Sequence, residues 1–438
     1  MTRAGSNGIG ERPARSLFGH PAGLTVLFTT QMWAEFSFFG LQALLVYYMT
    51  KKLGFDQAKS SLIYGAYGAA AFFSPFFGGL IADRWLGRTK SVIIGGAMMM
   101  FGHFAMASEA LLFPALVLVA LGNGLFIPPL AIQVGSLYAD DDPRKAYAYS
   151  AYYMGINLGG LLAPLVCGTL GELYGWHWGF TAAGVGMAIG LAIYCSFLPL
   201  LPPEPSRRNV ADEERPSVAP VVRQHVVILL LMVAMVVLFR VGYEQSGNVI
   251  ALWVRDFTDR SVDLFGLRVT IPATWFQSIN PLLIIVGTPL LIRFWKATRA
   301  KERTPDLLRR MAVGCVIATA AMAVMVVAAI ASGPAGARVS SLWVVLYFVL
   351  LTLGELYVIP VGLTLIESLA PVRFASMAMG GWYIAKFLGS LLAGVMGVYW
   401  LVIPAWTFFC LGLASTAVAA FCLFLMSNHS RLLGSSGE

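Results

Sequence analysis

The feature that most restricts the fold is a series of apolar stretches, each about 20 residues long, that recurs along all 438 residues. This length suits a helix that crosses the roughly 30 Å hydrocarbon core of a membrane. Backbone amide and carbonyl groups cannot stay unpaired in lipid, so each stretch is predicted to be an α-helix. The composition agrees, because 58% of the residues are hydrophobic and only 12% are charged. The sequence therefore predicts an all-α membrane protein.

The longest polar segment inside the chain, residues 201–224, divides the apolar stretches into two sets of six. It is rich in proline and in charges of both signs, which is typical of a linker. We predict an N-terminal tail over 1–21, a six-helix bundle over 22–200, the linker over 201–224, a second bundle over 225–427 and a tail over 428–438, whose last residues are typical of a cloning remnant. The twelve predicted transmembrane helices cover 22–50, 58–82, 90–109, 112–138, 147–171, 178–200, 225–252, 272–294, 311–332, 341–370, 374–398 and 402–426.

The placement of lysine and arginine predicts the orientation. Of these 30 residues, 21 lie in the termini and the even-numbered connections, and seven lie on the opposite side. Basic residues collect on the cytoplasmic side of membrane proteins, so both termini are predicted to be cytoplasmic. The same bias accounts for the net charge of +8, and no nucleic-acid partner is needed to explain it. Compact loops and the lack of a signal segment favour a bacterial inner membrane.

No enzyme or cofactor motif stands out. The five cysteines lie in apolar runs without metal-ligand spacing, which predicts small buried hydrophobic residues. There is no phosphate-binding loop, no HExxH and no nucleophile elbow. We therefore expect neither an enzyme nor a bound cofactor or metal.

The segment GGLIADRWLGRTK, residues 78–90, follows the second predicted helix. Its spacing of glycine, aspartate and basic residues resembles the cytoplasmic signature of the major facilitator superfamily. In that reading Asp83, Arg84 and Arg88 hold the loop at the membrane surface. The layout of six plus six helices fits the same superfamily and implies alternating access.

Five further segments follow the order and motifs of one branch of that superfamily. They resemble the proton-coupled oligopeptide transporters, the POT family, and their residues are 27–50, 121–180, 243–248, 272–290 and 354–389. The resemblance implies a monomeric secondary transporter for a small peptide or a peptide-like, amine-bearing solute. The 24-residue linker departs from many bacterial members, because it has no room for two extra helices between the halves.

The first helix departs from the family pattern ExxERFxYYGxR. Gln31 and Ala34 stand where the family has glutamates, and Glu35 and Gln42 stand where it has arginines. Ile127 replaces a family lysine on the fourth helix. The three cations that hold the peptide carboxylate in the family are therefore absent, and so is the usual proton site on this helix.

At other positions of the binding pocket, the residues of this sequence match the family pattern more closely. Glu355 falls on the family glutamate that takes the peptide's amino group. The remaining predicted substrate-binding residues are Asn157, Asn280, Trp382, Tyr67, Gln31, Phe38, Phe39, Gln42, Arg240 and Lys386.

Five charged residues are predicted at mid-membrane depth, namely Glu35, Arg240, Glu244, Glu355 and Lys386. Charges there are costly unless they face a cavity or a partner, so each is a candidate functional residue. Arg240 precedes Glu244 by one helical turn, so the two can bridge and take part in gating. Arg240 and Lys386 are unusual for the family and are the candidates for binding a substrate carboxylate. Glu35, whose helix offers no cation, and Glu244 are the candidate proton carriers.

Alternatives remain open at this stage. In one alternative, Arg240 and Glu244 form a purely structural pair. In another, Lys386 pairs with Glu355 or extends to the membrane surface. In a third alternative, the side chains of Trp382, Phe38 and Phe39 serve only packing. The function could instead be export or uncoupled transport of a different metabolite, such as a cationic or modified-peptide natural product, or that of a non-transporting receptor.

Overall fold

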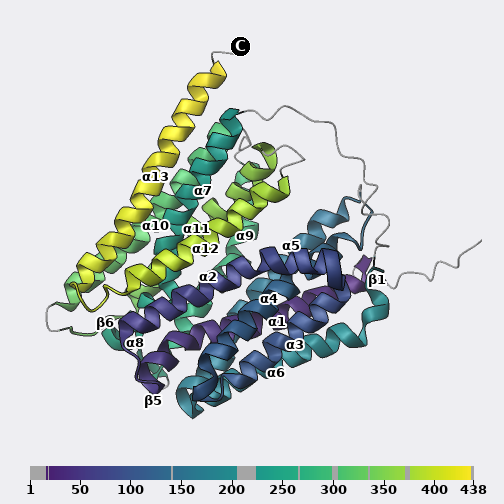
Figure 1. Ribbon diagram of the computed structural model, residues 1–438. Coiled ribbons are helices and arrows are strands. Elements are labelled where there is room, and N and C mark those ends of the chain that lie inside the picture. Colours follow the sequence, from purple (N-terminus) through teal and green to yellow (C-terminus); the bar gives the residue numbers. More distant parts are fainter. Residues whose placement is uncertain are drawn as a thin grey trace, which may run out of the picture.

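The computed structural model describes residues 16–17, 19–139, 142–204, 223–264, 267–297, 304–333, 336–369 and 375–435. These residues are almost entirely helical and form two bundles (Figure 1). The first bundle contains α1 (Ala22–Tyr47), α2 (Gln57–Ile81), α3 (Arg88–Ala105), α4 (Leu112–Gly135), α5 (Arg144–Ala163) and α6 (Trp176–Ser196). The second contains α7 (Arg223–Tyr243), α8 (Val249–Phe257), α9 (Ile279–Ala297), α10 (Thr304–Ser332), α11 (Leu342–Leu369), α12 (Ala375–Gly397) and α13 (Ala405–Ser435).

Short segments extend several of these helices. Single π-helical turns cover Tyr48–Lys52, Ala82–Leu86, Pro164–Gly168 and Leu170–Tyr174. Four 3₁₀ segments cover Glu109–Leu111, Leu198–Leu200, Glu244–Gly247 and Ala273–Ser278. The fifth and eighth predicted spans are thus completed by irregular turns at one end.

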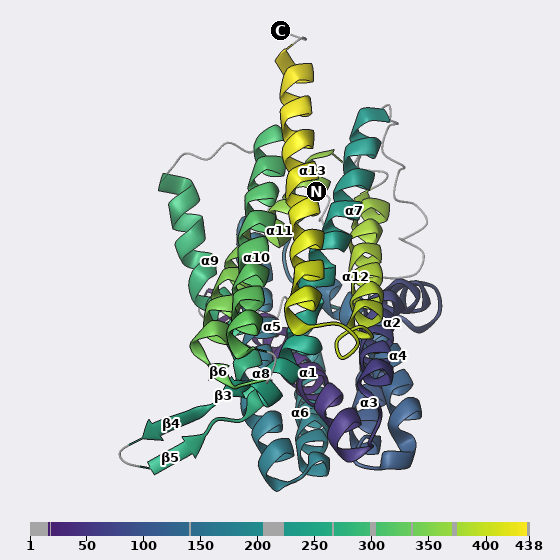
Figure 2. The same ribbon diagram turned by 90° about the vertical axis from the view of Figure 1, so that its left-hand side faces the viewer.

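The strands are short and lie outside the helical bundles. β1 (Ser16–Leu17) pairs with β2 (His20–Pro21), and β3 (Thr258–Asp259) pairs in parallel with β6 (Val339–Ser340). β4 (Ser261–Leu264) and β5 (Leu267–Thr270) form an antiparallel hairpin that projects from one end of the molecule (Figure 2).

Nine helical segments of the described chain are long and apolar enough to cross a membrane by composition alone. The other three predicted spans, 22–50, 90–109 and 374–398, coincide with α1, α3 and α12. α1 and α12 carry polar residues of the molecular centre, Glu35 and Lys386 among them, which lowers their hydropathy. The prediction of twelve helices in two bundles of six is confirmed.

The seventh span is a correction to the sequence prediction of one continuous helix over 225–252. α7 ends at Tyr243, a 3₁₀ segment follows, and α8 begins only after Asn248, whose φ of −105° and ψ of −95° are not helical. The Asn248 side chain accepts a hydrogen bond from the Ser61 hydroxyl in α2 at 2.9 Å. The break therefore places a polar contact between the two bundles that a regular helix would not make.

Within the first bundle α1 packs against α5 and α6, and α4 packs against α2 and α3. Within the second, α10 packs against α11 and α13, and α7 packs against α12 and α13. The bundles meet mainly along two helix pairs, α2 with α12 and α5 with α9. At Gly65 of α2 an added Cβ would come within 2.6 Å of the Gly394 backbone in α12. Only small residues allow helices to approach so closely.

The two bundles are tied together at one end. Their side-chain hydrogen bonds include Tyr47 to the Ala251 carbonyl at 2.8 Å and Arg255 to Thr50 at 2.9 Å. Glu172, at the end of the fifth span, accepts from the backbone amides of Ala273 and Thr274 at 3.0 and 2.8 Å. These contacts surround the loops after α1 and α8, on the side predicted to be extracellular.

At the opposite end, where the linker joins them, the bundles diverge (Figure 1). Within the described ranges no side-chain hydrogen bond joins the two bundles on that side. The molecule therefore has the form of an alternating-access transporter that is closed on the predicted outer side and open toward the linker.

Candidate functional site

Glu355 has the best-defined environment of the predicted site residues. It lies in α11 and is only 6% exposed. Its carboxylate accepts a hydrogen bond from the Asn280 amide in α9 at 2.7 Å and one from the Tyr243 hydroxyl at 3.1 Å. The same Asn280 nitrogen lies 3.0 Å from the Thr352 hydroxyl. Donors from two neighbouring helices thus fix the direction of this buried carboxylate.

The charge of Glu355 also reaches the N-terminal bundle. Its charge acts on the hydroxyl group of Tyr153 in α5, and Arg240 and Lys386 act on it in turn. The carboxylate is therefore close enough to the N-terminal bundle for its charge to reach Tyr153.

Arg240 and Glu244 form the ion pair that their spacing predicts. The pair is buried, with the Arg240 Nη2 donating to Glu244 Oε1. The guanidinium also lies over two aromatic rings, 4.9 Å from the centroid of Tyr243 and 5.3 Å from that of Phe72 in α2. Its Nε is buried and has no hydrogen-bond partner within the part of the chain that the structure describes. Arg240 is thus largely engaged by the protein itself.

Lys386 in α12 is engaged differently. Its Nζ lies 5.0 Å from the centroid of Phe72 and 5.7 Å from that of Tyr383. In the part of the chain that the structure describes, no carboxylate lies within 4.0 Å of it. Glu35, Glu244 and Glu355 all act on it over longer distances. Lys386 is therefore the central cation that forms no ion pair with the described carboxylates.

Glu35 in α1 ends a short chain of hydrogen bonds. The Tyr152 hydroxyl in α5 donates to the Gln31 carbonyl oxygen at 2.8 Å, and the Gln31 amide nitrogen donates to Glu35 Oε1 at 2.7 Å. All three side chains are buried. Gln31, at a position where the family has a glutamate, thus orients the carboxylate that stands in place of a family arginine.

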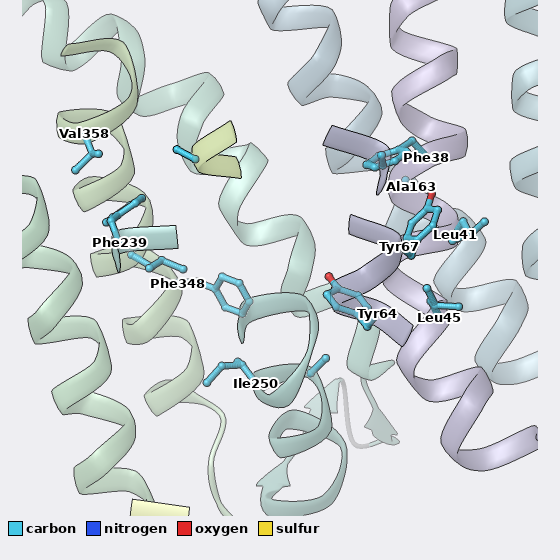
Figure 3. Packing of buried hydrophobic residues seen from close by; sticks show 14 of the residues in the cluster. Phe38, Leu41, Leu45, Tyr64, Tyr67, Ala163, Phe239, Ile250, Phe348 and Val358 are labelled. Carbon is cyan, nitrogen blue, oxygen red and sulfur yellow. The ribbon is translucent and has the colours of Figure 1, made fainter. Parts of the chain in front are cut away.

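Several aromatic residues of α1 and α2 pack against one another near this part of the N-terminal bundle. Phe38 packs against Phe39 edge to face at 5.6 Å and stacks on Tyr67 of α2 at 6.0 Å. Figure 3 shows Phe38, Tyr67 and Tyr64 together in the N-terminal bundle. The Tyr67 hydroxyl is buried and has no hydrogen-bond partner among the described residues. Gln42 lies within hydrogen-bonding reach of the Tyr64 hydroxyl.

Two further predicted site residues, Asn157 and Trp382, make contacts within their own bundles. The Asn157 amide donates to the Tyr153 carbonyl of its own helix at 3.0 Å. The Trp382 ring packs against Gly362 of α11, where an added Cβ would come within 2.7 Å of the ring. Both side chains are buried, and their part in binding stays a prediction.

The predicted loop signature lies far from this centre. Asp83 and Arg84 are exposed in the π-helical turn after α2. Arg88 donates to the Ser136 hydroxyl at 3.1 Å, which links the start of α3 to the end of α4. The carboxylate of Glu204 accepts from the Thr89 amide at 2.6 Å, so the beginning of the linker is attached to the same loop.

Several residues around the centre were not singled out from the sequence. Tyr243 donates to Glu355, Tyr152 donates to Gln31, and Phe72 lies beside both central cations. Tyr243 directly precedes Glu244 in a quoted family motif, so a signal for it existed. Phe72 had none, because aromatic residues are common throughout these helices.

A cavity of about 420 Å³ lies elsewhere, between α1, α5 and α6. Trp33, Phe36, Val166 and Trp178 are among its mostly apolar lining residues. None of the predicted site residues lines it, so it plays no part in the site described above.

Comparison with known proteins places this arrangement in a family. Residues 27–335 match the Major Facilitator Superfamily model. The peptide transporter YePEPT of Yersinia enterocolitica is 32% identical, over 87% of this chain and 88% of that protein. A di-/tripeptide transporter of Lactococcus lactis subsp. cremoris is 30% identical, over 85% of this chain and 88% of its own length. A crystal structure of a POT peptide transporter in complex with sulfate has a TM-score of 0.84 at 29% identity and covers 95% of this chain and 96% of that one.

The chain belongs to the POT family of the major facilitator superfamily. A further POT-family structure, in complex with 5-aminolevulinic acid, shares the fold with a TM-score of 0.86 at 24% identity and covers 95% of this chain and 98% of that one. The family resemblance and the expectation of a multi-pass secondary transporter are thus confirmed. The POT family is a transporter family and not an enzyme class.

Proposed function

We propose that this POT-family protein moves a small peptide or a peptide-like, amine-bearing solute across the membrane by alternating access. The names of its relatives as peptide transporters support this cargo. The observation that carries the proposal is the buried carboxylate of Glu355, held by Asn280 and Tyr243 of the same bundle. A fixed, buried carboxylate is well suited to bind the ammonium group of a substrate.

The carboxylate of the substrate would bind Lys386. Arg240 is the stronger clamp in principle, because its planar guanidinium can hold a carboxylate through two parallel hydrogen bonds. Its Nη2 is already paired with Glu244, however, whereas Lys386 lies against two aromatic rings and has no carboxylate within 4.0 Å among the described residues. The positive charge of Arg240 would then attract the substrate carboxylate without binding it directly.

Proton coupling would proceed through a carboxylate of the centre. Glu35 is the leading candidate, because its only hydrogen bond within the described residues comes from the neutral Gln31 amide. Glu244 is the second candidate, although its pairing with Arg240 ties it to the structure. The proposed setting is the inner membrane of a bacterium, with both termini in the cytoplasm and the protein acting as a monomer.

A second candidate function is transport of a different, cationic metabolite, by export or without coupling. One observation favours it. The α1 side of the centre holds Gln31, Glu35 and Gln42 and no cation, so a solute without a carboxylate would lose nothing there.

A thermal-shift screen of the purified protein in detergent tests both candidates. The panel holds free di- and tripeptides, their C-terminal amides, their N-acetylated forms and polyamines. A ligand that binds only the folded state raises the apparent melting temperature. Stabilisation by free peptides that is lost on N-acetylation is the expected result. Stabilisation by polyamines alone would favour the second candidate, and no response to any peptide would overturn the first.

A further inference from the structure

The central charges do not balance within the protein. Three carboxylates, Glu35, Glu244 and Glu355, stand against two cations, Arg240 and Lys386. Glu244 is paired with Arg240, and Glu355 is held by two hydrogen-bond donors. With all five groups ionised, the centre therefore carries one negative charge in excess. Among the described residues, Glu35 accepts one hydrogen bond, from the neutral Gln31 amide, and forms no ion pair within 4.0 Å.

The surroundings of Glu35 resemble a binding site for a cation. Its charge acts on the hydroxyl groups of Tyr67, Tyr152 and Tyr383, which lie on α2, α5 and α12. Hydroxyl oxygens near a buried carboxylate can accept hydrogen bonds from an ammonium or guanidinium group that the carboxylate attracts. The buried Tyr67 hydroxyl, which lacks a partner among the described residues, is a further polar group available to a ligand.

Lys386 does not fill this site. It is the charged residue that acts on Glu35, yet it makes no ion pair with Glu35 within 4.0 Å. Its ammonium lies against the Phe72 and Tyr383 rings instead. A second cation near Glu35 would thus meet an unpaired carboxylate.

We propose that Glu35 binds a cationic side chain of the substrate, so that the transporter prefers peptides that contain lysine or arginine. This inference rests on the proposed function, with the substrate's amino group at Glu355 and its carboxylate at Lys386. A dipeptide with one lysine carries a net charge of about +1 near neutral pH, which balances the excess charge of the centre. A neutral dipeptide leaves Glu35 to be neutralised by a proton.

The test measures dissociation constants of three dipeptides that differ in one side chain, Ala-Ala, Ala-Lys and Ala-Glu. For the unmodified protein we expect Ala-Lys to bind about tenfold more tightly than Ala-Ala, which corresponds to about 1.4 kcal/mol. Ala-Glu should bind more weakly than Ala-Ala. In Glu35→Gln the ratio of the Ala-Ala dissociation constant to the Ala-Lys dissociation constant should fall from about ten to about one. Glu35→Asp, which keeps the charge, should retain part of the preference.

The outcomes separate this inference from the proposed function. Equal binding of Ala-Lys and Ala-Ala by the unmodified protein would overturn the inference and leave peptide transport standing. The same holds if Glu35→Gln keeps the full preference for Ala-Lys. Binding of none of the three dipeptides would overturn the proposed function, and the inference with it. The comparison within the unmodified protein decides the matter even if a variant fails to fold.

Discussion

At the scale of single residues, the site is defined by which charges are already satisfied. Arg240 and Glu244 neutralise each other, and Glu355 is held by neutral donors. Among the described residues, Lys386 and Glu35 have no ionic partner within 4.0 Å. Buried charges are tolerated only with such compensation. The partially compensated groups are therefore the ones that a substrate or a proton can engage.

Replacement of Glu355 by glutamine should weaken the binding of amine-bearing ligands. The substitution keeps the side-chain shape and removes the charge that would hold an ammonium group. A charge-assisted hydrogen bond contributes about 1.5–3 kcal/mol, so affinity should fall roughly 10- to 100-fold. Titration calorimetry on the purified variant measures the change. An N-acetylated ligand serves as the control, since its affinity should be nearly independent of the substitution. Unchanged affinity for free peptides would remove Glu355 from the site.

Replacement of Arg240 by methionine should destabilise the fold. It leaves Glu244 buried without its cation, and breaking a buried pair in this way costs about 3–5 kcal/mol. The melting temperature in detergent should drop accordingly. Exchange of the two residues, Arg240→Glu with Glu244→Arg, should restore most of it.

The exchanged double variant also reports on mechanism. Normal stability together with normal transport would mean that the pair is purely structural. Normal stability with lost transport would assign the pair a part in binding or gating. A methionine variant as stable as the unmodified protein would contradict the burial argument.

At the scale of helices, close approach between the bundles depends on small residues. α2 of the first bundle and α12 of the second meet where Gly65 faces Gly394. Within the second bundle, α12 meets α7 in the same way where Gly389 faces Arg240. The seventh span is broken between Tyr243 and Val249, and the break supplies Asn248 as a contact to Ser61. Small residues and the broken seventh span thus shape the contact between the two bundles.

Substitution of Gly65 by alanine should destabilise the protein even though alanine is the better helix former. An added Cβ would come within 2.6 Å of the Gly394 backbone, and overpacking of this kind costs about 1–3 kcal/mol. Gly380→Ala is the matched control, because a Cβ there meets nothing within 4 Å. That variant should be unchanged or stabilised by up to about 1 kcal/mol. Melting temperatures of the two variants check the prediction, and an equally stable Gly65→Ala would refute it.

At the scale of the whole molecule, the two bundles act as bodies that are tied at one end. Glu172 caps the start of the eighth span across the interface, and Tyr47 and Arg255 add contacts between the bundles nearby. The described residues hold no comparable side-chain hydrogen bonds on the linker side. These contacts stabilise the closed state of the predicted outer side, together with the other hydrogen bonds and the packed helices that join the bundles there.

Replacement of Glu172 by glutamine should shift the equilibrium toward opening of the outer side. Loss of a capping carboxylate costs about 0.5–2 kcal/mol, which corresponds to a shift in population of up to about 30-fold. Spin labels at Lys59 and Val402, on exposed positions of the two bundles, should report a longer distance by double electron–electron resonance. Glu109→Gln is the control, because its exposed ion pair with Lys52 lies within one bundle and contributes little. Identical distance distributions in the two variants would count against a latch at Glu172.

The sequence by itself determined the class of fold and the inventory of central charges. Apolar stretches of membrane-spanning length can only be helices, and the polar linker divided them into two bundles, so these predictions needed no tertiary information. The spacing of Arg240 and Glu244 likewise predicted their ion pair, because one helical turn brings their side chains together.

Only the tertiary structure decided which charges meet across helices. Tyr243 and Asn280 reach Glu355 from two other helices, Tyr152 reaches Gln31 from α5, and Phe72 lies beside both central cations. The break of the seventh span was also missed, because the apolar pattern continues through it. Contacts of this kind depend on how helices are rotated and packed against one another. Periodicity within one helix carries no information about its neighbours, so these partners became visible only when the bundles were assembled.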